Sequence, residues 1–136
     1  MILNVVTPHG ARFVDLEVKA VTLPGVMGEM QILPGHEALL AALDIGIMRI
    51  EPVEGAEIIA AVSGGYVEVI GDTCHCLVET CETPDEIDLE KARSKEEEVS
   101  KLLEETDPLS EEYQARLKSL RKAQVRQQVG RMKQVD

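Results

Sequence analysis

The chain has 136 residues, a length that fits one domain or two small ones. Its formal net charge of −11 argues against a nucleic acid as the main partner, because phosphate binding needs a basic surface. Only 2% of the residues are aromatic, so any core must be aliphatic. The sequence contains no apolar run near the ~20 residues that cross a bilayer and no pattern of a secretion signal. We therefore expect membrane association only through a partner, with no direct insertion.

From residue 1 to about residue 82, short β-branched runs alternate with Gly, Pro or Asp. Many short strands at close spacing predict an antiparallel sandwich or barrel. The sequence at 70–73, Ile-Gly-Asp-Thr, predicts a tight hairpin turn with Gly71 and Asp72 at its centre. Alternation over 17–23 predicts that Val18, Ala20 and Thr22 share one face of a strand.

The composition changes near residue 84 to strong helix formers. Asp88 is the expected N-cap of a first helix, with Ile87 packing on Ala92. The break at 106–108 contains a proline, and Ser110 can cap a second helix. We expect a β-sandwich domain over 1–83 and an antiparallel helical hairpin over 84–136. The predicted apolar stripes are narrow and consist of Leu89, Ala92, Val99, Leu102, Leu103, Tyr113, Leu117, Leu120, Val125, Val129 and Met132.

Charge separates the two predicted helices. Residues 85–112 contain twelve acidic and four basic residues, a net charge of −8, whereas residues 113–136 contain seven basic and one acidic residue, a net charge of +6. Exposed ion pairs contribute only ~0–1 kcal/mol each, so the attraction between the helices is weak. Two interpretations remain open: a solvated face of the hairpin, or a basic helix that can exchange its partner for another acidic surface.

The sequence offers few groups for catalysis or metal binding. It has no nucleophile elbow, no phosphate-binding glycine loop and no carboxylate pair in opposed environments, so we expect no catalytic residue. Cys74, His75, Cys76 and Cys81 suit zinc or copper by ligand type. On a strand, however, Cys74 and Cys76 point to one face and His75 to the other. Free, buried thiols are therefore favoured over a metal site, and no metal is expected.

Four segments occur in the order that is typical of a known family. They are VVTPHG at 5–10, LPGVMGEMQILPGH at 23–36, AVSGGYVEV at 61–69 and EIDLEKA at 86–92. Together they resemble the epsilon subunits of F-type ATP synthases, whose fold is a β-sandwich followed by a helix–loop–helix. The resemblance covers essentially the whole chain. One local departure is the sequence Glu-Ala-Leu-Leu at 37–40, where the family commonly has Ala-Pro-Leu; this departure puts the shape of that loop in question.

The resemblance implies a non-catalytic subunit of the central stalk, or rotor, of a proton-translocating ATP synthase. Its expected partners are the gamma subunit, the membrane ring of c subunits, and the alpha/beta catalytic head through extended C-terminal helices. The expected location is the cytoplasmic face of the bacterial inner membrane, as a peripheral part of the complex. Glu29 and His36 match the residues that lie near the loops of the c-ring in this family. The alternatives are an unrelated acidic adaptor, and a thiol or metal protein that uses the three cysteines.

The resemblance also implies a regulatory tail that inhibits ATP hydrolysis. We expect its contact with the catalytic head to involve the bases of the second helix, Arg116, Lys118, Arg121, Lys122 and Arg126.

Some family members bind ATP at an Ile/Leu-Asp-x-x-Arg-Ala motif. Ile87, Asp88 and Ala92 match this motif, and Glu82 occupies a corresponding upstream acidic position. Lys91 replaces the motif arginine and lacks its planar fork of donors. We therefore expect weak regulatory ATP binding or none, and no other cofactor.

Overall fold

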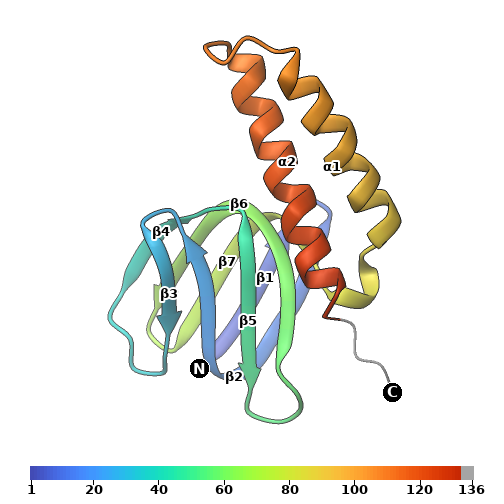
Figure 1. The fold of residues 1–136 in the computed structure, drawn as a ribbon. Coiled ribbons are helices and arrows are strands. Elements are labelled where there is room, and N and C mark those ends of the chain that lie inside the picture. Colours follow the sequence, from blue (N-terminus) through green and yellow to red (C-terminus); the bar gives the residue numbers. More distant parts are fainter. Residues whose placement is uncertain (133–136) are drawn as a thin grey trace. The chain divides into compact units, whose positions relative to one another are not determined.

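The computed structural model describes residues 1–132, and the last four residues of the expected hairpin, 133–136, lie outside this part. The chain divides into two compact units, residues 1–82 and the residues from Thr83 on. The first unit contains the strands and the second contains the helices (Figure 1). The expected β + α fold class is thus confirmed. The strands are β1 (Ile2–Thr7), β2 (Gly10–Gly25), β3 (Gly28–Ile32), β4 (Leu39–Leu43), β5 (Gly46–Pro52), β6 (Ile58–Ile70) and β7 (Thr73–Glu82).

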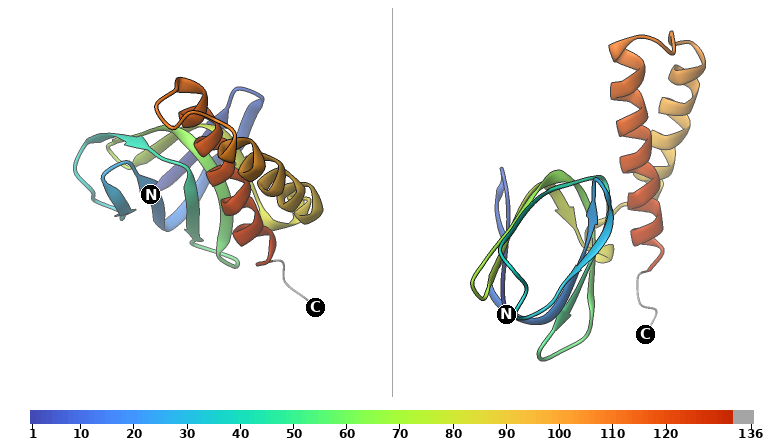
Figure 2. Two further views of the ribbon diagram at one scale, coloured as in Figure 1. Left: turned by 45° about the horizontal axis from the view of Figure 1, so that its top comes forward. Right: turned by 90° about the vertical axis from the view of Figure 1, so that its left-hand side faces the viewer.

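Five of the strands form a closed circuit of hydrogen-bonded pairs. β1 pairs with β7, β7 with β6, β6 with β5, β5 with β2, and β2 again with β1. Seen from the side, this unit has two curved layers (Figure 2, right). The pairing is antiparallel as predicted, except that β1 and β7 run parallel. β4 and β3 extend the sheet beyond the circuit through β6 and β2.

The long strand β6 exchanges one neighbour for another at Gly64 and Gly65. Residues 58–62 pair with β5, and residues 65–69 pair with β4. At the bend the backbone of β6 lies close to β7, because a Cβ atom on Gly65 would be 1.9 Å from the carbonyl oxygen of Leu77. A side chain therefore cannot be accommodated at Gly65 unless the two strands move apart.

The interior of the β unit is aliphatic, as the composition predicts. Its largest buried side chains include Leu3, Leu23, Ile32, Met48 and Ile50, each with 0% exposure. The predicted hairpin turn is confirmed, because Ile70 pairs with Thr73 and Gly71 adopts a φ of +59°.

The predicted alternation along β2 was wrong at one position. Val18 and Ala20 are buried, but Thr22 is half-exposed, whereas Val21 and Leu23 are buried. The pairing of β2 with β5 shifts its register between Val18 and Ala20. This irregularity turns the strand, so the odd-numbered residues after it face the core.

The second unit is a helical hairpin that follows a 3-10 turn, η1 (Pro84–Glu86). Helices α1 (Leu89–Glu104) and α2 (Glu111–Gly130) run antiparallel side by side (Figures 1 and 2). Both predicted caps are confirmed. The Asp88 carboxylate accepts a hydrogen bond from the Lys91 amide at 3.1 Å, and the Ser110 hydroxyl accepts one from the Tyr113 amide at 3.2 Å. These contacts satisfy amides that have no partner within the helix.

We predict that residues 1–84 fold without the helices, because the closed circuit of strands encloses its own aliphatic core. This fragment should retain β-sheet circular dichroism and melt in one cooperative transition. The full chain is the control. A fragment that aggregates, or that melts without a transition, would contradict the division into independent units.

Candidate interaction surfaces

An apolar row crosses the outer face of four strands in the β unit. Val6 of β1 pairs with Leu77 of β7, Leu77 pairs with Tyr66 of β6, and Tyr66 pairs with Ala42 of β4. Val6, Leu77 and Tyr66 are 41%, 56% and 59% exposed. Directly paired residues lie side by side on one face of a sheet, so this row is continuous.

Two further large apolar side chains lie on the same face. Side chains alternate along a strand, so Ile70 shares the face of Tyr66, and Leu40 shares that of Ala42. Ile70 is 59% exposed and Leu40 is 69% exposed. Exposed apolar side chains that lie together on one face indicate an interaction surface, whereas single scattered ones do not.

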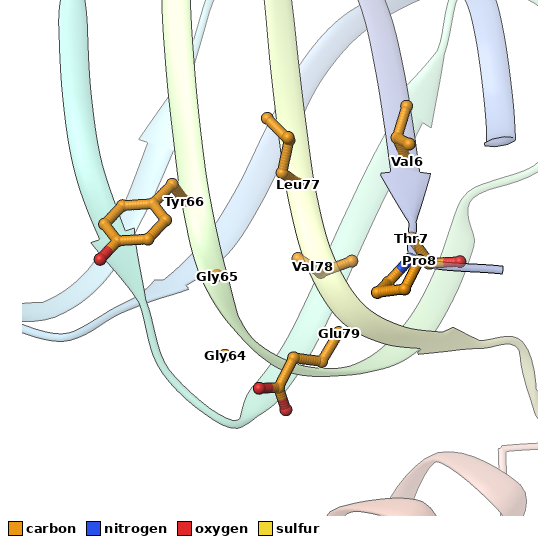
Figure 3. A pocket seen from close by; sticks show the side chains of 9 residues that line it. All are labelled: Val6, Thr7, Pro8, Gly64, Gly65, Tyr66, Leu77, Val78 and Glu79. Carbon is orange, nitrogen blue, oxygen red and sulfur yellow. The ribbon is translucent and has the colours of Figure 1, made fainter. Parts of the chain in front are cut away.

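A shallow groove of about 500 Å³ lies beside the apolar row, along Val6, Leu77 and Tyr66 (Figure 3). Gly64 and Gly65 lack side chains and leave this space open beside Tyr66 and Leu77. The sequence motif Gly-Gly at 64–65 therefore has two consequences: the close approach of β6 to β7, and a hollow on the exposed face. The groove is lined by Val6, Thr7, Pro8, Gly64, Gly65, Tyr66, Leu77, Val78 and Glu79.

The two residues that resemble c-ring contacts lie near the two ends of β3 along the chain, Glu29 near its start and His36 in the loop after its end. Glu29 lies on β3 opposite Pro24 of β2, and its side chain is exposed. His36 lies in the loop after β3, where its amide donates to the Leu33 carbonyl oxygen at 3.1 Å. The His36 side chain is exposed, and its Nδ1 lies 2.9 Å from the Glu37 carbonyl oxygen.

The tip of the β2–β3 hairpin is apolar, which the sequence interpretation missed. Val26 and Met27 connect the two strands and are 56% and 99% exposed. A pair of glycines, Gly25 and Gly28, closes the turn, and Gly28 has a φ of +124°. The two glycines that flank this pair were the available signal, because glycine permits the positive φ that a tight turn requires.

Three of the five candidate ATP-binding residues, Ile87, Asp88 and Ala92, are engaged in the helical hairpin. Ile87 and Ala92 are buried, with 2% and 0% exposure. The Asp88 carboxylate caps α1, and Lys91 is exposed on the first turn. Glu82 is half-buried at the end of β7. The Asp88 carboxylate, which the motif would offer to a nucleotide, therefore already caps α1 as predicted.

Close packing holds the end of α2 against the beginning of the hairpin. A Cβ atom on Gly130 would lie 2.6 Å from Leu89 Cδ2 and 3.1 Å from Ile87 Cγ2. Gln127 is buried, and its Nε2 donates to the Glu96 carboxylate of α1 at 3.1 Å. The apolar stripes predicted from the sequence did not include Gln127 or Gly130, because neither residue has a large apolar side chain.

The five bases of α2 do not share one face. Successive helical residues are rotated by about 100°, so Arg116 and Lys118 point about 160° apart. Lys118 and Arg121 are exposed, whereas Lys122 and Arg126 are half-buried. The Arg116 side chain is 28% exposed and contacts the end of α1.

The three cysteines are free thiols in the interior of the β unit. Cys74 and Cys76 are buried on one face of β7, and His75 is half-exposed on the other face, as the alternation predicts. The hydrogen bond with Cys74 and the burial of the thiol both raise the pKa of Cys76, so this thiol is protonated at neutral pH. Among residues 1–132, no three His, Cys, Asp or Glu side chains are arranged to hold a metal ion.

Within the described residues, neither helix combines the length and the apolar character that crossing a membrane requires.

Comparison with known proteins connects this fold to one family. Residues 1–84 match the family model described as the beta-sandwich domain of the ATP synthase delta/epsilon chain. The chain is 33% identical over 132 residues to the ATP synthase epsilon chain of an Exiguobacterium species, which covers 97% of this chain and 96% of the relative. It is 38% identical over 121 residues to the ATP synthase epsilon chain of Halalkalibacterium halodurans, which covers 89% of this chain and 90% of the relative.

A solved structure has the same fold. It belongs to the Euglena gracilis mitochondrial ATP synthase, described as OSCP/F1/c-ring in rotational state 1, with a TM-score of 0.79 and 24% identity. The likeness covers 91% of this chain and 77% of the other chain. The likeness shows that a chain of this assembly has the same fold as the present chain. The chain belongs to the family of ATP synthase epsilon chains. The resemblance inferred from the four sequence segments is confirmed.

Proposed function

We propose that the chain is a non-catalytic rotor subunit that couples rotation of a c-ring to the catalytic head of an F-type ATP synthase. Membership of the epsilon chain family carries this proposal, since the alignment with one relative spans 97% of the chain. We place the subunit at the cytoplasmic face of a bacterial plasma membrane, held there by its partners. In this proposal the β unit couples and the helical hairpin regulates.

We assign the gamma subunit to the apolar face of the β unit. A rotor subunit must resist torque, so it needs a stable interface with its neighbour. Stable interfaces have an apolar centre in which aromatic side chains contribute much of the binding energy. The row Val6, Leu77, Tyr66 supplies such a centre, and the groove beside Gly64 and Gly65 can receive a side chain from the partner.

Replacing Val6 by Glu should weaken binding of the cognate gamma subunit at least tenfold, because a carboxylate would lose its water in the apolar interface. The matched control is Val53→Glu in the loop between β5 and β6, since Val53 is 45% exposed and Val6 is 41% exposed. Isothermal titration of the full chain with gamma measures both affinities. Equal effects of the two substitutions would remove this face from the gamma interface.

We assign contact with the polar loops of the c-ring to the region around Glu29 and His36. Both side chains are exposed, and each is held on a short, well-defined turn or strand. Contacts at a hydrated rim contribute little individually. The exposed pair Val26 and Met27 at the hairpin tip adds apolar area beside Glu29.

Single substitutions Glu29→Ala or His36→Ala should therefore reduce ATP-driven proton pumping only partly. The double substitution Glu29→Lys with His36→Glu should reduce it further, because it places a cation where Glu29 is anionic and adds an anion at residue 36. Fluorescence quenching in inverted membrane vesicles measures pumping, and ATPase activity of the same vesicles is the control. Normal pumping in the double variant would exclude both residues from the interface.

We assign inhibition of ATP hydrolysis to the basic helix α2 after it leaves α1. Residues 113–136 have a net charge of +6, and residues 85–112 have a net charge of −8. Screened surface attraction of this kind is weak, so a partner can compete for the basic helix. Lys118, Arg121, Lys122 and Arg126 are the bases that we expect to contact the catalytic head.

Ending the chain after Thr83 should raise the ATPase rate of the reconstituted complex several-fold and leave ATP synthesis coupled. The β unit still connects gamma to the ring in this variant, whereas the inhibitory helix is missing. Steady-state hydrolysis and proton-driven synthesis are measured on the same preparation, with the full-length chain as the control. Equal hydrolysis rates across nucleotide and salt conditions would exclude an inhibitory tail.

We propose that regulatory ATP binding is weak or absent. Ile87 and Ala92 are buried, and the Asp88 carboxylate accepts the Lys91 amide. A nucleotide would have to compete for this cap. Lys91 also offers a point charge where the motif arginine offers two parallel donors.

A further inference from the structure

Arg116 connects the two helices at the loop end of the hairpin. Its Nη1 donates to the Thr106 hydroxyl and to the Leu102 carbonyl oxygen, the latter at 3.5 Å. Its Nη2 donates to the Glu112 carboxylate at 2.9 Å. The Thr106 hydroxyl itself donates to the Leu102 carbonyl oxygen at 2.5 Å. One guanidinium thus contacts the last turn of α1, the loop and the first turns of α2.

These contacts lie at the C-terminal end of α1, where the electrostatic environment favours a cation. Leu102 lies near the end of α1, where carbonyl groups lack partners within the helix and the helix dipole is negative. A cation at this end is favourable, and a half-buried charged hydrogen bond is stronger than an exposed ion pair. The planar fork of arginine can reach an acceptor on α1 and another on α2 at the same time.

We propose that Arg116 is a positioning residue that holds the helical hairpin closed, rather than a contact to the catalytic head. For α2 to extend, as the proposed function requires, the guanidinium must leave Thr106 and Leu102. Arg116 then sets how often the hairpin opens. Lys118, which points about 160° away and is exposed, has no such part in the closed hairpin.

The two possible roles of Arg116 predict opposite changes in the inhibition of ATP hydrolysis when the residue is removed. If the guanidinium keeps the hairpin closed, removing it increases the open population and deepens inhibition of ATP hydrolysis. If it contacts the head instead, removing it relieves inhibition. Thr106→Val separates these roles further, because it removes the acceptor on the other side of the contact and changes no basic residue.

The test uses the full chain with Arg116→Ala, Thr106→Val and, as the control, Lys118→Ala. Hydrogen exchange of the α1 amides in the free chain should become about tenfold faster in the first two variants and stay unchanged in the control. In the reconstituted complex, Arg116→Ala and Thr106→Val should inhibit hydrolysis more strongly than the native chain. A circular dichroism melt of each variant establishes that both units remain folded.

Unchanged exchange in Arg116→Ala and Thr106→Val would overturn the proposal, as would relief of inhibition by Arg116→Ala that Lys118→Ala reproduces. The proposed function fails by a different result, namely unchanged hydrolysis after truncation at Thr83. In that case the exchange rates of the free chain still decide whether Arg116 closes the hairpin.

Discussion

The close approach of β6 to β7 at Gly65 is the constraint on which the β unit depends. The carbonyl oxygen of Leu77 occupies the place that a side chain on residue 65 would need. Because the backbone can bend here, β6 pairs first with β5 and then with β4, and the circuit of strands closes around an aliphatic core. A closed circuit leaves few unpaired strand edges, which limits unwanted association. The same bend opens the groove on the outer face.

The helical hairpin is stabilised differently from the β unit. Few residues of the described hairpin are fully buried, and they are Ile87, Ala92, Val99, Ala123, Gln127, Val129 and Gly130. This set buries less apolar area than the interior of the β unit, so the hydrophobic contribution is smaller. Hydrogen bonds between the helices and their loop therefore contribute a larger part of the stability of the hairpin. Examples are the bonds of Gln127 with Glu96 and of Arg116 with Thr106. Such a hairpin can open at a cost that a partner's surface can offset.

Local features of the fold could be predicted from the sequence because local chemistry determines them. The caps at Asp88 and Ser110 and the turn at Gly71 need only neighbouring residues. The register shift in β2 and the parallel pairing of β1 with β7 could not be predicted, since they depend on strands that are distant in sequence. The apolar row also depends on pairing between strands that are distant in sequence. Val6, Leu77 and Tyr66 are ordinary strand residues until the register places them side by side.

The basic residues of α2 show why charge alone is a poor guide to a site. In the sequence Arg116 and Lys118 are equivalent members of a cluster, and both suit an acidic partner. In the fold Arg116 is 28% exposed and lies at the negative end of α1, whereas Lys118 is exposed. A charge that already has directed, half-buried partners must lose them before it can bind elsewhere, and that loss opposes the new contact. An exposed charge has no such penalty. The same helix can therefore carry residues that favour the closed hairpin and residues that favour its release.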